Sequence, residues 1–329
     1  MVDRRAFVNA AAGLLALPLA VPAQQAGRIF RLGILSPGAR TTASPGLPQW
    51  LVPHLHELGY VEGRNLMVEA RYADDRSELL PGLARDLVQR NLDVIVTIGA
   101  AAIRAAMGAT TAVPIVFLNN LDPVAAGFVA SLARPGGNVT GVMITPQGTL
   151  GEKKLALLKE MVPRATRIVL LTTEPVGEGT EAQVEEVRRA AARLGLDIVV
   201  VEVRGGDYAR AFADVAAARP AALFVGAHSR FVRDRSRIIE LAAIGRFPAI
   251  YQWPQQVRDG GLMSYGASDV ETYRQVAIYV DRIFKGARPS ELPIEQPSKL
   301  LLLINLNTAK AMGLSIPQSL LLRADEVIR

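Results

Sequence analysis

The chain has 329 residues, half of them hydrophobic, with no cysteine and a formal net charge of +6. At roughly 150 residues per domain, this length predicts two domains or one large one. The composition argues against a disordered or fibrous protein, and the missing cysteine excludes disulfides, thiolate metal sites and cysteine nucleophiles. The basic residues are mostly arginines spread singly along the chain, and aromatic residues make up only 5% of it. We therefore expect no nucleic-acid-binding face, which requires a clustered basic stripe.

The chain begins with the arrangement of an export signal, which we place at residues 1–23. Two arginines precede an apolar run over residues 10–21, and residues 21–23 offer the small side chains that a signal peptidase reads. Residues 3–7 also resemble the twin-arginine signature, whose cargo crosses the membrane already folded; an ordinary Sec signal is the alternative. We expect a soluble, periplasmic mature chain with no transmembrane segment and, without cysteine, no lipid anchor.

After the signal, short β-branched runs alternate with helical patterns. Strands are predicted at residues 29–35, 65–72, 93–98 and 114–118, and helices at 47–58, 78–90 and 100–108. The order restarts after residue 150, with strands at 167–171, 197–203, 221–225 and 248–251 and helices at 181–194, 208–218 and 231–244. Two more extended segments, 261–265 and 300–304, enclose a helix at 272–284. Short apolar runs without alternation are typical of strands buried on both faces. The predicted fold class is therefore α/β, with two doubly wound parallel-sheet lobes.

Several ordered stretches of this sequence resemble one family of proteins. They are LDPV (121–124), SLARPGGNVTG (131–141), ELGYVEGRNL (57–66), GGLMSYG (260–266), YVDRIFKGARPSELPIEQP (279–297) and INLNTAKAMGLSIPQSLLLRADEVI (304–328). The chain resembles the periplasmic substrate-binding components of ABC importers, in the subgroup that includes tryptophan- and tyrosine-type binding proteins. The resemblance runs from about residue 28 to the C-terminus.

This resemblance implies the type I periplasmic-binding fold, in which three crossing segments join two α/β lobes. We place the crossings near residues 140–146, 262–266 and 298–302. Lobe one is then expected at 28–143 and 265–298, and lobe two at 144–264 and 299–329.

Ligands of open parallel sheets bind in the crevice beyond the carboxyl ends of the strands. Applied to this chain, that rule gives the candidate ligand-binding residues Ser36, Gly99, Ala100, Asn119, Asn120, Asp122, Thr173, Glu174, His228, Ser229, Trp253 and Tyr265. Asp269, like Tyr265, lies at or beside a crossing segment.

Several of these candidates have a stated role. The helix that begins near residues 99–101 offers free backbone N–H groups to a carboxylate or another anion. Asp122 and Glu174 can hold an ammonium, because a charge buried on closure needs an opposite partner. Trp253 or Tyr265 can supply a stacking face, although Trp253 can instead pack under a loop.

Other assignments have structural alternatives. Asn119, Asn120 and Ser229 offer neutral hydrogen bonds to a ligand, but the two asparagines also fit plain turns. Asp122 can simply cap a helix over residues 124–133.

The sequence also departs from the commoner pattern of the family at two positions that face the expected cleft. Ala100 and Ala101 stand where many relatives have Thr-Pro. Residues 173–175, Thr-Glu-Pro, stand where relatives often have Trp-Asn-Pro. The family's amino-acid specificity therefore transfers poorly to this chain.

Residues 177–182 fit the dinucleotide pattern G-x-G-x-x-A, but nearby glutamates would repel a pyrophosphate, and a loop before a helix explains the match better. A Ser–His–Asp arrangement that uses His228 is not selected by anything in the sequence. His54 and His56 lie about 200° apart around a helix, which makes them poor joint metal ligands. We expect no cofactor, no metal site and no catalytic residue.

The sequence thus predicts an extracytoplasmic solute-binding component of an ABC importer, not an enzyme. It would capture a small molecule, such as an amino acid, possibly aromatic, or a small carboxylate, by hinge closure around the cleft. Its expected partner is an ABC permease with a separate ATPase, and we expect a monomer. The alternatives are a ligand sensor for a receptor kinase or a periplasmic enzyme on the same fold. A repressor would need a DNA-reading helix-turn-helix where the signal stands.

Overall fold

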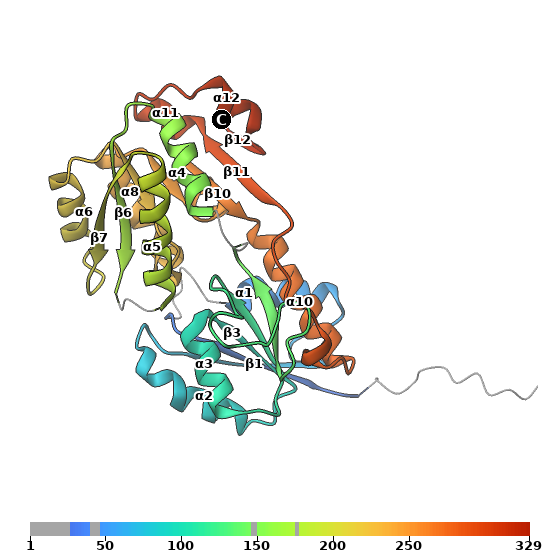
Figure 1. Cartoon of the computed structure of the whole chain (residues 1–329). Helices are drawn as coiled ribbons and strands as arrows, with labels where there is room; N and C mark the ends of the chain where they lie inside the picture. Colours follow the sequence, from blue (N-terminus) through green and yellow to red (C-terminus); the bar gives the residue numbers. More distant parts are fainter. Residues whose placement is uncertain (1–26, 40–46, 146–149, 175–177) are drawn as a thin grey trace, which may run out of the picture.

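The computed structural model describes residues 27–39, 47–145, 150–174 and 178–329 (Figure 1). The export signal expected at residues 1–23 lies outside these ranges, and so do Pro175 and Gly177. Within the described residues the strands form two separate sheets, one of five strands and one of seven.

The first sheet is entirely parallel, with the order β2-β1-β3-β4-β5. Its strands are β1 (Phe30–Ser36), β2 (Leu66–Tyr72), β3 (Val94–Ile98), β4 (Ile115–Asn119) and β5 (Val139–Met143). The helices of this half are α1 (Leu47–Glu57), α2 (Leu80–Val88), which follows the 3₁₀ turn η1 (Ser77–Leu79), and α3 (Gly99–Ala109).

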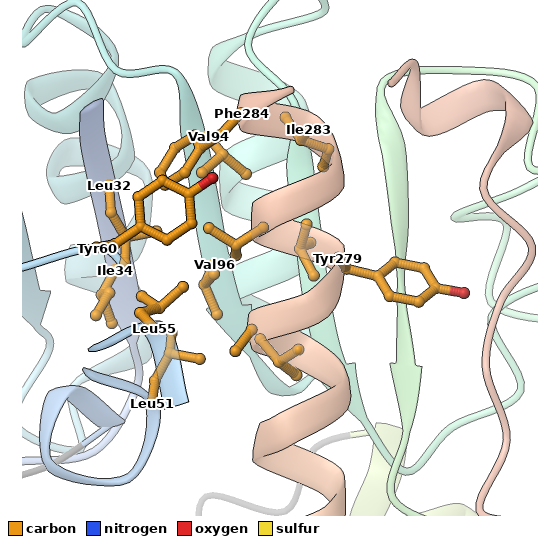
Figure 2. Packing of buried hydrophobic residues seen from close by; sticks show 14 of the residues in the cluster. Leu32, Ile34, Leu51, Leu55, Tyr60, Val94, Val96, Tyr279, Ile283 and Phe284 are labelled. Atoms are coloured by element: carbon orange, nitrogen blue, oxygen red, sulfur yellow. The ribbon is translucent and has the colours of Figure 1, made fainter. Parts of the chain in front are cut away.

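Helices cover both faces of this sheet, so its strands are buried on both sides. Leu32 and Ile34 point to one face and pack in a cluster with α1 and with α10 (Asp269–Phe284), a helix from much later in the chain (Figure 2). Leu35 and Ile95 pack on the other face, in a cluster with α2 and α3. The unbroken apolar runs of the sequence follow from this two-sided burial.

The second sheet has the order β12-β11-β10-β9-β8-β6-β7 and is parallel except where β10 runs antiparallel to β11. Its strands are β6 (Arg167–Thr173), β7 (Asp197–Val203), β8 (Ala222–Val225), β9 (Ala249–Tyr251), β10 (Met263–Ala267), β11 (Leu300–Asn305) and β12 (Glu326–Ile328). Its helices are α4 (Leu150–Met161), α5 (Glu178–Arg193), α6 (Tyr208–Ala217), α7 (Ser229–Arg233), α8 (Arg235–Ile244), α9 (Pro254–Arg258), α11 (Leu306–Ala311) and α12 (Gln318–Arg323).

The chain passes between the two sheets three times. It leaves the first sheet after β5, returns from β10 to α10, and leaves again after η2 (Pro289–Glu291) to enter β11. In Figure 1, β10 and β11 lie together in the upper part of the molecule, and α10 lies below them. The expected lobe boundary after residue 264 falls inside β10, which stays paired with β11 as far as Ala267.

The structure corrects several expected elements. The segment 140–146, expected to cross between lobes, begins with β5, which pairs with β4 in the first sheet. The helix expected at 231–244 is broken at Asp234, whose backbone (φ −94°, ψ 17°) leaves the helical region between α7 and α8. Residues 124–133 form turns and bends instead of a helix, with Gly127 at a positive φ of 73°.

Gly141 explains why β5 is hard to recognise in the sequence. Glycine is depleted in strands, so the run VTGVM reads as a weak strand. The structure requires it, because a Cβ atom at this position would lie 2.4 Å from the carbonyl oxygen of Phe117 on the neighbouring strand.

Candidate functional site

A cavity of about 580 Å³ lies between the two halves of the molecule and is lined by residues of both. The first half contributes the ends of β1, β3 and β4 with the start of α3, and the second contributes α7 and α9. The first turn of α10, next to one of the crossings, completes the wall. The site thus lies beyond the carboxyl ends of the strands, where parallel sheets bind their ligands.

The start of α3 presents backbone donors to this cavity. Gly99 has a positive φ of 74°, and Ile98 at the N-cap gives no side-chain hydrogen bond to the first turn. The first N–H groups of α3 therefore have no side-chain cap. Arg104 lines the same wall one turn further on, with its guanidinium 5.0 Å above the ring of Phe128.

Asn119 offers a buried acceptor at the end of β4. Only 1% of the residue is exposed, and its Nδ2 donates to the carbonyl of Leu121 at 3.2 Å. Among the described residues, no donor is within hydrogen-bond distance of its Oδ1. A buried acceptor left without a donor is costly, so this oxygen is suited to a donor supplied by a ligand.

His228 and Ser229 enter the wall at the start of α7. The Nδ1 atom of His228 accepts a 3.1 Å hydrogen bond from the backbone N–H of Arg230. Burial, and then the positive charge of Arg230, lower the pKa of His228 to about 4. The imidazole is therefore neutral at neutral pH, and its role in the free protein is that of a helix cap.

Aromatic rings form much of the remaining wall. Trp50 of α1 and Tyr273 of α10 stack with their ring centroids 6.0 Å apart and an interplanar angle of 16°. Trp253 precedes Pro254 at the start of α9 and lines the cavity from the second half. An apolar wall with a few fixed polar groups is typical of a small-molecule site.

Two aspartates lie in the wall of this cavity, Asp75 and Asp269. Asp75 accepts a 2.6 Å hydrogen bond from Arg233 across the cavity. Burial raises the pKa of Asp269 to about 7, because the nearby positive charges of Arg258 and Arg235 offset it only in part.

A second cavity of about 250 Å³ adjoins the first, since Asn120 lines both. Its most unusual group is Lys154, which is 1% exposed, donates to Oε1 of Gln252 and lies 5.6 Å above the ring of Phe224. Burial lowers the pKa of Lys154 to about 7.

The structure brings most of the predicted residues together. Those that line the larger cavity are Ser36, Gly99, Ala100, Asn119, Asn120, His228, Ser229 and Trp253. Whether they contact a ligand stays a prediction.

The other four candidates lie elsewhere. Asp122 lines the smaller cavity, and its Oδ1 accepts from the N–H groups of Val124 and Ala125, so it caps a turn. Glu174 accepts a 2.6 Å hydrogen bond from the N–H of Gly205. Neither carboxylate lines the larger cavity, and the ammonium role expected of them stays a prediction.

Thr173 and Tyr265 are parts of the second sheet and its packing. The hydroxyl of Thr173 donates to the carbonyl of Val203 and accepts from Arg230 at 3.2 Å. Tyr265 packs against the buried cluster around α4 and α5 and does not line the larger cavity, so its expected stacking role stays a prediction.

Sequence reasoning missed Trp50, Tyr273, Asp75 and Arg233. Asp75 follows β2 closely, and the strand-end rule applied to that strand would have found it. Trp50 and Tyr273 lie inside helical patterns, and no local signal separates a ring that faces a cavity from one that faces a core.

Two other kinds of site were sought in the part of the chain that the structure describes. No helix there has the length and apolar character needed to cross a membrane. The same residues include no group of three or more histidine, aspartate or glutamate side chains placed to hold a metal ion.

Two α/β units joined by three crossings, with a mostly apolar cavity between them, define a two-lobed solute-binding fold. A family model described as ABC transporter substrate binding protein matches residues 43–328. The chain belongs to this family, and its fold is the type I periplasmic-binding fold expected from the sequence.

Three individual relatives show how similar the chain is to known proteins. A tyrosine-binding protein of Clostridioides difficile is 24% identical over 261 residues, which are 79% of this chain and 74% of that protein. The crystal structure of a conserved domain protein from Vibrio cholerae has a TM-score of 0.80 and 26% identity, and covers 91% of this chain and 100% of its own. An ABC domain from Streptococcus pneumoniae in complex with L-Trp has a TM-score of 0.79 and 23% identity over the same shares.

Proposed function

We propose that this chain captures a small solute in the larger cavity and delivers it to the permease of an ABC importer. The observation that carries the proposal is the cavity of about 580 Å³, whose wall combines residues from both halves of a chain that crosses three times between them. The solute is an amino acid, with aromatic ones included, or a small carboxylate. The relatives that bind tyrosine and L-Trp support the aromatic choice.

Capture works by closure of two lobes, which we assign to residues 28–143 with 265–298 and to residues 144–264 with 299–329. Closure follows binding only if the solute has extra affinity for the closed state. A cavity lined from both lobes supplies that difference, because the solute contacts both walls only when they approach.

We also propose a cellular location and a partner for this chain. The signal at residues 1–23 supports a periplasmic location, and the family supports a partnership with a permease powered by a separate ATPase. We propose a monomer without cofactor or catalytic residue. In support of this, Nδ1 of His228 is already occupied by the N–H of Arg230.

A thermal-shift screen of the mature chain tests the proposal. The panel contains amino acids, nucleosides, aromatic acids and small carboxylates. A true solute at 100 times its dissociation constant should raise the free energy of unfolding by about 2.7 kcal/mol. Recovery of the solute unchanged after binding supports a carrier, whereas its conversion would support an enzyme. If no compound of any class stabilises the protein, the proposed solute capture is wrong.

A further inference from the structure

Asp269 is an acidic group in the cavity wall, and no basic side chain among the described residues forms an ion pair with it. It is the first residue of α10, directly after the crossing from β10. Ser268 caps the helix by accepting from the N–H of Glu271, so the carboxylate of Asp269 is not needed as a cap. Its side chain lines the larger cavity instead.

The arginines nearest to Asp269 are committed to other acids. Arg258 forms a bidentate pair with Glu326, with one contact at 2.7 Å, and Arg235 pairs with Asp259. The backbone N–H of Gln255 donates a hydrogen bond to the Asp269 carboxyl. A partly buried carboxylate without an ion-pair partner gains from an opposite charge, and the cavity is where one can enter.

The second acid in the wall differs in this respect. Asp75 contacts Arg233 at 2.6 Å and Arg230 at 3.4 Å, so its charge is already compensated. The electrostatic attraction of a cation in the cavity is therefore stronger toward Asp269 than toward Asp75.

Three aromatic residues line the same cavity as Asp269. Tyr273 lies one turn after Asp269 on α10, and Trp50 stacks on Tyr273. Trp253 immediately precedes α9, the helix whose Gln255 backbone bonds the Asp269 carboxyl. The faces of aromatic rings carry negative potential and attract organic cations.

We propose that Asp269, with the rings of Trp50, Tyr273 and Trp253, forms a subsite for an ammonium group, so that the solute of this protein carries a protonated or methylated amine. This inference rests on the proposed capture of a solute in the larger cavity and narrows its class. Amino acids and amines fit the subsite, and simple carboxylates without an amine do not.

Titration calorimetry with matched compounds tests the subsite. The probes are L-tryptophan, tryptamine and indole-3-propionate, together with L-tyrosine, tyramine and 3-(4-hydroxyphenyl)propionate. We expect the amine-bearing members to bind at least about tenfold more tightly than the deaminated acids. Asp269→Asn should weaken amine binding by about 100-fold, the loss expected when one partner of a buried charge pair is removed.

The control is Glu271→Gln, on the same helix and paired with Arg274 outside the cavity, which should leave affinity unchanged. Melting temperatures of both variants report whether they fold, and Trp50→Leu gives a second test by removing one ring. Tighter binding of the deaminated acids, or amine binding that is unchanged in Asp269→Asn, would overturn the ammonium subsite while solute capture stands. Binding of no solute of any class would overturn both proposals.

Discussion

The guanidinium of Arg233 donates a 2.6 Å hydrogen bond to Oδ2 of Asp75, and this bond joins the two halves of the molecule across the larger cavity. Asp75 stands in the loop after β2, in the first half, and Arg233 ends α7 in the second. Arg230 approaches the same carboxylate at 3.4 Å, and Asp234 accepts from both Arg233 and Tyr208. The side chains of Arg230, Arg233 and Asp75 are all less than a fifth exposed, so water screens this network only weakly.

Asp75→Asn should weaken the connection between the halves. The neutral amide keeps the shape of the side chain but loses the charge, which we expect to reduce the free energy of unfolding by about 1–2 kcal/mol. In solution without solute, the radius of gyration from X-ray scattering should increase as the halves separate. Asp74→Asn is the matched control, since Asp74 is exposed and both residues have a positive φ that asparagine tolerates. An unchanged radius in both variants would show that the bond does not hold the halves together.

Amine binding should depend on pH through Asp269. Burial raises the pKa of this carboxyl to about 7, so below that pH the free protein holds a proton that an incoming ammonium must displace. The affinity for tryptamine should therefore fall by up to about tenfold per pH unit below pH 7 and level off above it. Arg235 and Arg258 are the charged side chains that act on the same carboxyl, and Tyr273 lies one turn after it on α10. Calorimetry between about pH 5 and pH 8 measures the slope, which should vanish in Asp269→Asn if the carboxyl is its source.

Lys154 should give a second pH dependence, which affects stability instead of affinity and lies above pH 7. Burial lowers its pKa from 10.5 to about 7, so between these values the unfolded chain binds more protons than the folded one. The stability contribution of Lys154 therefore rises with pH across this range, by up to about 1.4 kcal/mol per unit, and is constant below it.

Lys154→Met removes the buried amine while keeping an unbranched side chain. The unfolding free energy of the natural protein minus that of the variant should then increase as pH rises from about 7 to about 9. Chemical denaturation at each pH measures it. Lys153→Met, at the neighbouring exposed position, should show no such trend. A pH-independent difference for Lys154→Met would mean that its amine is not perturbed by burial.

Gly141→Ala tests the close approach of β5 and β4. A Cβ atom would meet the carbonyl oxygen of Phe117 at 2.4 Å and its backbone nitrogen at 2.6 Å, so the strands must move apart. We expect a loss of about 1–3 kcal/mol in unfolding free energy. Gly108→Ala lies in helix α3 with open space around its position, and it should stabilise the protein by about 0.5–1 kcal/mol. Equal melting temperatures for the two variants would contradict the packing described for β5.

Much of the fold could be predicted from the sequence because its strands are buried on both faces. Runs such as residues 93–98 and 114–118 are largely apolar and do not alternate with polar residues, and they appear as β3 and β4 within one or two residues. Strand β5 was missed since the constraint on Gly141 comes from Phe117 on another strand. The break between α7 and α8 was missed for a similar reason, because Asp234 is fixed by Tyr208 of a distant helix.

The candidate site, like the fold, could be predicted from the sequence only in part. Strand ends can be located in a sequence, and Ser36, Asn119 and His228 were found in that way. The hydrogen-bond partner of a carboxylate cannot be located from the sequence in this way. Glu174, for example, accepts a hydrogen bond from the backbone N–H of Gly205, a contact that no sequence spacing indicates. Trp50 and Tyr273 needed the packing of α1 against α10 before their shared face could be known.

The packing of α10 on the first sheet also constrains how the protein is made. The face that holds Leu32 and Ile34 is closed by α10, which ends at Phe284. A ribosome adding about 5–20 residues per second leaves that apolar face uncovered for on the order of ten seconds after β5 is complete. During that interval the nascent chain exposes a hydrophobic surface that chaperones bind and that other nascent chains can join. Synthesis of the first sheet alone therefore does not give a finished folding unit, and premature termination before residue 269 would release an aggregation-prone fragment.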